Sequence, residues 1–74
     1  MVSVYVLIRA DGDKVWETVT GVKEIDGVTR AEVVTGPYDV IMMAELPSVE
    51  GLRRLMQSVH DVDGVERTET CIGI

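Results

Sequence analysis

The amino-acid sequence predicts an α+β fold in which two strand-helix-strand units follow each other along the chain. Three observations lead to this prediction. Runs of β-branched and aromatic residues alternate with stretches whose apolar residues recur every three or four positions. The two halves of the chain repeat each other, and 74 residues suffice for one small domain only. Two such units in tandem most economically form a split βαβ sandwich.

The repeat has an offset of 37 residues, at which DGVTRAE in the first half returns as DGVERTE in the second. Six positions are identical: Asp26, Gly27, Val28, Arg30, Glu32 and Gly36 align with Asp63, Gly64, Val65, Arg67, Glu69 and Gly73. In each half we expect the Asp-Gly pair to end a helix, because glycine tolerates a left-handed backbone at that point. The valine that follows then begins a strand.

The first half opens with VSVYVLI (Val2–Ile8), a run that is too short for a typical helix and that stops at the turn-prone ADGD. It predicts a strand. Asp13 can cap the helix that follows. The apolar stripe of this helix repeats at spacings of four and three, at Val15, Val19 and Val22. After Asp26-Gly27, the segment VTRAEVVT (28–35) predicts a second strand.

In the second half, Gly36-Pro37 turns the chain into a third strand, YDVIMMAEL (38–46), which Pro47 ends. Ser48 can cap a second amphipathic helix. Its apolar residues are Val49, Leu52, Leu55, Met56 and Val59. A last strand, VERTETCIGI (65–74), is predicted after Asp63-Gly64.

Charge predicts where each strand lies in the sheet. The second and fourth strands carry the charged residues, which belong at sheet edges because they discourage uncontrolled pairing there. The expected fold is therefore a ferredoxin-like sandwich (β-α-β-β-α-β) with the antiparallel strand order 4-1-3-2. Both faces of the sheet centre are apolar, and the helices can cover only one of them. The bare face should pack against a second copy, which predicts a homodimer and a dimeric α/β barrel.

Composition excludes several functions. Thirteen acidic and seven basic residues give a net charge of −6, so we expect no direct nucleic-acid binding. No signal peptide or apolar span predicts a membrane partner, and we expect the chain in the cytoplasm. No metal-binding or phosphate-loop motif is present, so neither a metal nor a cofactor is predicted. His60 is interpreted as a surface cation near a helix end, and the single cysteine, Cys71, as a small buried hydrophobic residue.

The segment TGPYDV places Tyr38 and Asp39 at the start of an otherwise apolar strand. A carboxylate in this position costs free energy unless it is hydrogen-bonded or paired. Asp39 therefore has two interpretations. It can satisfy backbone amides of the turn, or it can hold the ammonium group of a ligand.

The whole pattern resembles the effector-binding (RAM) domain of the Lrp/AsnC leucine-responsive regulator family. The likeness rests on VYVLI, VVTGPYDVIM and DGVERTETCI, and it covers essentially all of residues 1–74. It implies the same sandwich, dimers that form through the sheets, and rings of dimers, octameric or similar. It also implies small effectors, usually amino acids, bound where dimers meet.

Carried over by motif, the resemblance implies a ligand site with Asp39 near the amino group of the ligand. The implied site residues are Gly36, Tyr38, Asp39, Val49, Cys71, Ile72 and Gly73. Family regulators also carry a helix-turn-helix domain, which this chain is expected to lack because it starts with the first sensor strand. We therefore expect a stand-alone amino-acid-binding module that regulates amino-acid metabolism or transcription through oligomeric assembly.

Two alternatives stay open. One is a small dimeric α/β-barrel enzyme, monooxygenase- or isomerase-like, and the other is a structural partner of full-length Lrp/AsnC regulators. Catalysis by a barrel enzyme needs acid or base groups inside the barrel. The inward positions of the central strands are aliphatic, so we predict that the chain is not an enzyme.

Overall fold

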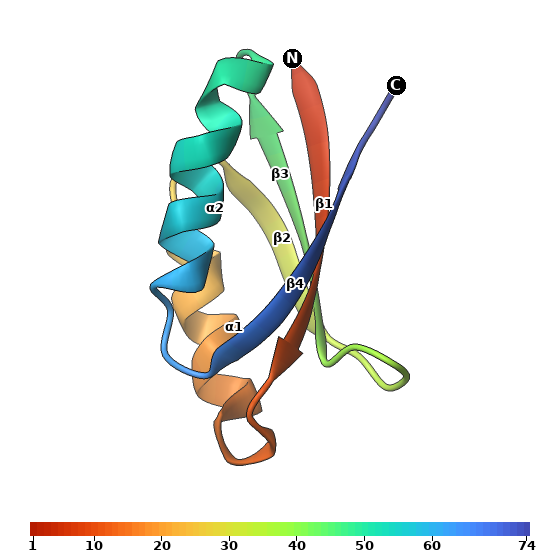
Figure 1. Ribbon diagram of the computed structural model, residues 1–74, viewed down its shortest axis with the longest axis vertical. Helices are drawn as coiled ribbons and strands as arrows, with labels where there is room; N and C mark the ends of the chain where they lie inside the picture. Colours follow the sequence, from red (N-terminus) through yellow and green to blue (C-terminus); the bar gives the residue numbers. More distant parts are fainter.

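The computed structural model describes residues 1–74 and contains the predicted elements in the predicted order (Figure 1). The strands are β1 (Val2–Ala10), β2 (Val28–Val33), β3 (Val40–Leu46) and β4 (Val65–Ile72). The helices are α1 (Val15–Lys23) and α2 (Leu52–His60), each preceded by a short 3-10 turn, η1 (Gly12–Lys14) and η2 (Val49–Gly51).

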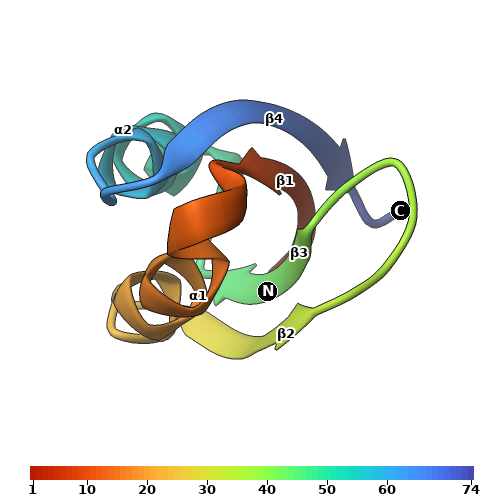
Figure 2. The same ribbon diagram turned by 90° about the horizontal axis from the view of Figure 1, so that it is seen from below.

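The four strands form one antiparallel sheet with the order β2-β3-β1-β4, which is the predicted 4-1-3-2 order counted from the other edge. The charged strands β2 and β4 are its edges, as expected. Both helices lie on one side, and Figure 2 shows the sheet curving around them. The concave face of the sheet is therefore covered, whereas the convex face is free of other elements.

The core lies between the concave face and the helices. Side chains alternate along the central strands, so that Val4, Val6 and Ile8 of β1 are buried while Tyr5 is exposed. Burial of each large apolar side chain contributes about 1.5–3 kcal/mol. The full core comprises Val4, Val6, Ile8, Val19, Val22, Ala31, Val40, Met42, Ala44, Leu46, Leu55 and Val59.

The convex face, called the open face from here on, has an apolar centre formed by Tyr5, Leu7, Ile41 and Met43. These residues pair across β1 and β3, Tyr5 with Met43 and Leu7 with Ile41. Tyr5 and Ile41 are 38% and 37% exposed. Charged side chains of the edge strands flank this centre, so the open face has an apolar strip with polar margins.

The backbone confirms the role predicted for the repeated glycines. Gly27 and Gly64 have φ values of 91° and 96°, and each stands just before the strand that closes its half. The first predicted cap is wrong, because Asp11 and not Asp13 caps the first turn, and its carboxylate accepts the N–H of Asp13 at 3.0 Å. Ser48 does occupy the N-cap position of η2, but its side chain makes no cap bond.

Candidate functional site

The loop between β2 and β3, residues 34–39, contains the first predicted site residues. In Figures 1 and 2 this hairpin loop reaches beyond the sheet on the side away from the helices. Gly36 has a φ of 136°, and no atom lies within 4 Å of the position that a Cβ would take there. The loop is therefore accessible from outside the subunit.

Asp39 is fixed in the sheet by its backbone and by its side chain. Its N–H donates to the carbonyl of Ile8 and its carbonyl accepts the N–H of Val34, both at 2.9 Å. Its carboxylate Oδ2 accepts the N–H of Ala10 at 2.8 Å. Asp39 therefore does satisfy a backbone amide, as one of its two interpretations predicted. The amide belongs to Ala10 of β1, however, and not to the turn. The second carboxylate oxygen, Oδ1, has no hydrogen-bond partner within the chain.

A side chain of the sheet holds the hairpin loop at one end of the open face. Arg9 of β1 donates from Nη1 to the carbonyl of Pro37 at 2.6 Å. Interaction of the Tyr38 hydroxyl with the carboxylate of Glu69 on β4, followed by desolvation, raises the pKa of Tyr38 above its ordinary value. The loop is therefore bonded to β1 and lies close to the Glu69 side chain of β4.

The other predicted residues lie at the opposite end of the sheet. Val49 begins η2, close behind the end of β3, where Leu46 pairs with Val2. Ile72 pairs with Val4, and the N–H of Gly73 donates to the carbonyl of Ser3 at 2.8 Å. Asp39, in contrast, bonds to Ile8 and Ala10 at the far end of β1. One copy of the chain therefore presents the predicted residues as two separate groups.

The prediction of a buried Cys71 is wrong for the single subunit, where this cysteine is free and exposed. The reason is the pairing of β4. Cys71 lies opposite Tyr5 at the edge of the open face, so its side chain points away from the core. Gly73 nearby is tightly packed, since a Cβ there would lie 3.3 Å from the Cβ of Ser3 and 3.5 Å from the ring of Tyr5.

His60 ends α2 and is exposed, as expected, and its Nε2 lies 3.0 Å from the hydroxyl of Thr68. No group of three or more histidine, cysteine or acidic side chains could hold a metal ion. Neither helix is long and apolar enough to cross a membrane.

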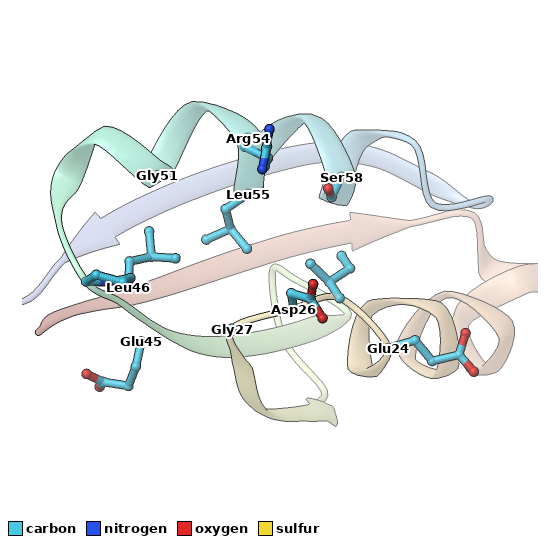
Figure 3. Close-up of a pocket in the computed structure, with 11 residues that line it drawn as sticks. Glu24, Asp26, Gly27, Glu45, Leu46, Gly51, Arg54, Leu55 and Ser58 are labelled. Atoms are coloured by element: carbon cyan, nitrogen blue, oxygen red, sulfur yellow. The ribbon is translucent and has the colours of Figure 1, made fainter.

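Sequence reasoning missed a groove of about 460 Å³ on the helix side of the subunit, shown in Figure 3. This helix groove lies between α2 and the turn that joins α1 to β2. Its lining includes Asp26 and Gly27 on the turn side and Gly51, Arg54, Leu55 and Ser58 on the α2 side. A signal was present in the sequence, because the 37-residue repeat aligns Gly51 with Lys14 and thus indicates a missing side chain.

The geometry defines a class of protein: a small α+β domain with one covered sheet face, one open apolar face and a polar loop bonded to β1 at its end. The sequence profile described as the Lrp/AsnC ligand binding domain matches residues 3–74. The chain belongs to this family, as the resemblance predicted.

Relatives agree with this assignment. An uncharacterized HTH-type transcriptional regulator of Pyrococcus furiosus is 39% identical over 67 residues, which make up 90% of this chain and 45% of the regulator. The chain thus spans less than half the length of that relative. A crystal structure of a protein from Thermus thermophilus has a TM-score of 0.94 and 36% identity, and the match covers 100% of this chain and 94% of the other.

The fold is shared more widely. A transcriptional regulator of Neisseria meningitidis, crystallised as a complex with L-Met, has a TM-score of 0.86. The match covers 99% of this chain and 49% of the regulator, at 12% identity. At this identity the likeness concerns the fold alone.

Proposed function

We propose that the chain is an amino-acid-binding module that regulates transcription or amino-acid metabolism through its assembly state. The observation that carries the proposal is the open face, an apolar strip left bare beside a polar loop that is held in place by hydrogen bonds to β1. Membership in a family of ligand-binding domains supports it. So does the shared fold with a regulator that was crystallised with L-Met.

The first step of assembly would be a twofold dimer through the open face. Tyr5, Leu7, Ile41 and Met43 supply an apolar centre, and the charged edge strands supply a polar rim, which is the usual anatomy of an interface between subunits. A symmetric pair of sheets would bury this strip and also cover Cys71. Because a chain of 74 residues has only a small core, burial at this interface would contribute a large part of the stability.

The effector site would then be completed by a neighbouring copy. Gly36, Tyr38 and Asp39 lie at one end of the sheet, whereas Val49, Cys71, Ile72 and Gly73 lie at the other, so one copy cannot bring both groups to one ligand. A ring of dimers, octameric or similar, brings opposite ends together. In that site the Oδ1 oxygen of Asp39 would receive the ammonium group of the amino acid.

The enzyme alternative finds little support between the sheet and the helices. The buried residues of that layer are aliphatic or thioether side chains apart from Thr18, whose hydroxyl donates to the carbonyl of Asp63 at 2.9 Å. Acid-base catalysis requires a titratable group within reach of the substrate. The structural-partner alternative is compatible with the same interfaces, and co-purification with a full-length regulator would favour it.

A thermal-shift screen of the twenty amino acids tests the proposal, because a ligand that binds only the folded state raises the melting temperature. The matched variants are Asp39→Asn and Asp39→Ala. Asn keeps an oxygen for the N–H of Ala10 but removes the charge, whereas Ala removes both and should cost about 1 kcal/mol of stability. We expect the shift to vanish in Asp39→Asn while the fold stays intact. A ligand shift that survives this substitution would refute the role of Asp39.

Assembly is tested by size-exclusion chromatography with light scattering. We expect a dimer or a larger ring at micromolar concentration, and Ile41→Glu should convert it to monomers by placing a charge in the apolar strip. Gln57→Glu is the control, because Gln57 is exposed on α2, on the opposite side of the sheet from the apolar strip. A wild-type monomer would contradict the proposed assembly.

A further inference from the structure

The two halves of the chain repeat a junction between a helix and the turn before a strand, and the two junctions differ. The closed junction joins η1, through Lys14, and α1, through Thr18, to Asp63 and Gly64. The open junction is its counterpart at the 37-residue offset, where Gly51 and Leu55 face Asp26 and Gly27 across the helix groove. The open junction lacks side chains that the closed junction has.

In the closed junction, side chains occupy the space between the helix and the turn. The ammonium of Lys14 lies 3.2 Å from the Asp63 carboxylate, and the Thr18 hydroxyl donates to the Asp63 carbonyl at 2.9 Å. Gly64 is so close that a Cβ there would lie 3.0 Å from the Cβ of Lys14. Gly21 likewise has room for no side chain, because its Cβ would lie 2.9 Å from Val62.

In the open junction, each of these partners is missing or replaced. Gly51 stands where Lys14 stands, so no ammonium reaches the Asp26 carboxylate. Leu55 stands where Thr18 stands, so no hydroxyl reaches the Asp26 carbonyl. The only ion pairs of the structure are Lys14–Asp63 and Arg30–Glu32, and Asp26 therefore has no cationic partner. The groove of about 460 Å³ occupies this unfilled position.

The other wall of the helix groove carries the opposite charge. Arg54 and Ser58 lie one turn apart on α2 and line the groove across from Asp26 (Figure 3). Arg54 aligns with Glu17 in the closed junction, so the charge at this position is reversed. Leu46 and Leu55 contribute apolar side chains to the lining of the groove. A guanidinium is suited to a carboxylate, because its planar fork of donors matches the two oxygens.

We propose that the helix groove is a second ligand site, separate from the hairpin loop, that takes a small zwitterion of the amino-acid class. The ammonium of the ligand takes the position that Lys14 holds in the closed junction and pairs with Asp26. Its carboxylate pairs with Arg54, and its side chain rests on Leu46 and Leu55. This site is complete within one subunit, so it does not depend on assembly.

The charges decide between ligand classes. A simple amine would pair with Asp26 but leave Arg54 without a partner, and a simple carboxylate would pair with Arg54 but meet the charge of Asp26. The lining also includes Glu24, whose side chain is directed away from Asp26 in Figure 3, and Glu45, whose Oε2 accepts the hydroxyl of Ser3 at 2.6 Å. These two carboxylates favour the ammonium of a ligand further, but only a ligand that carries both charges pairs with both Asp26 and Arg54.

Nuclear magnetic resonance of the isotope-labelled protein tests the site. The probes are the twenty amino acids at millimolar concentration, with methylamine and acetate as half-ligands. We expect at least one amino acid to shift the amide signals of Asp26 and Gly27 and the methyl signals of Leu55, and the half-ligands to shift them less. Asp26→Asn should weaken this binding about tenfold, since it removes one charge-assisted contact.

A second variant closes the groove deliberately. Gly51→Lys supplies the side chain that the closed junction has, and the backbone at Gly51 is an ordinary helical one with open contacts of 3.8 Å to Leu46. We expect Gly51→Lys to abolish the shifts and its control, Gly51→Ala, to retain them. Asp39→Asn should leave them unchanged, so failure of the hairpin site and failure of this site are distinguishable. The inference is overturned if no amino acid moves these signals, or if Gly51→Lys binds as the wild type does.

Discussion

The closed and open junctions contain the same kind of turn, but only the open junction has a groove beside it. Both have an Asp-Gly pair after a helix, both glycines have a positive φ, and a valine starts the next strand in both. One junction is filled by Lys14 and Thr18, whereas the other leaves a groove beside Gly51 and Leu55. The repeat thus preserves the backbone of each half and allows the side chains around it to differ.

This difference separates stability from function within one small domain. In the closed junction, Asp63 accepts a hydrogen bond from the buried hydroxyl of Thr18 and forms a surface ion pair with Lys14. These two contacts hold α1 against the start of β4. The open junction leaves the corresponding carboxylate, Asp26, without a partner.

The largest expected effect comes from replacing the two repeated glycines. An alanine at either position must adopt a positive φ, which costs about 1–2 kcal/mol. At Gly64 the new Cβ would also overlap the Thr18 hydroxyl, whereas at Gly27 the nearest atom is a carbonyl oxygen at 3.3 Å. Overpacking adds about 1–3 kcal/mol. Urea denaturation should therefore show that Gly64→Ala loses about 3 kcal/mol and Gly27→Ala about 1–2 kcal/mol.

Gly36→Ala is the control for this pair, because Gly36 also has a positive φ but no atom within 4 Å of its Cβ position. The loss of stability in Gly36→Ala therefore measures the effect of the backbone conformation alone, without the effect of overpacking. Equal losses at Gly64 and Gly27 would show that the two junctions are packed alike, and the contrast between them would fail.

A smaller effect is expected from the hydroxyl that distinguishes the junctions. Thr18→Val keeps the shape of the side chain but leaves the carbonyl of Asp63 without its donor, and Thr18 is fully buried. We expect a loss of about 1–2 kcal/mol in the free energy of unfolding. Thr20→Val is the control, because the Thr20 hydroxyl is exposed and donates only within its own helix, to the carbonyl of Trp16. It should change stability by less than about 0.5 kcal/mol.

The fold was largely predictable because the signals that specify it are local and repeated. Alternating patterns locate the strands, apolar spacings of three and four locate the helices, and the charges of β2 and β4 place these strands at the edges. Helix starts were less predictable. Asp11 and Asp13 are both suitable caps by residue type, and only the bond of the Asp11 carboxylate to the N–H of Asp13 decides between them.

The candidate site was predictable only in part. The motif selected Tyr38 and Asp39 as candidates, but the pairing of Asp39 with Ala10 depends on how far β1 runs past β3, and sequence patterns do not determine that register. Cys71 was misplaced because an apolar strand tail has the same composition whether it points into the core or along the open face. Its pairing with Tyr5 decides the matter.

The smallest predicted effect is the pH dependence of the closed junction. The hydrogen bond to Asp63 and the charge of that carboxylate raise the pKa of Lys14 above its ordinary value of 10.5. A cation whose pKa is raised on folding contributes stability that is fully present below the pKa of the unfolded chain, about 10.4, and lost as the pH rises through the folded value. Wild-type protein should therefore lose more stability than Lys14→Gln between neutral and strongly alkaline pH. Because the pair is exposed, added salt should shrink the difference, and a salt-independent difference would contradict an electrostatic origin.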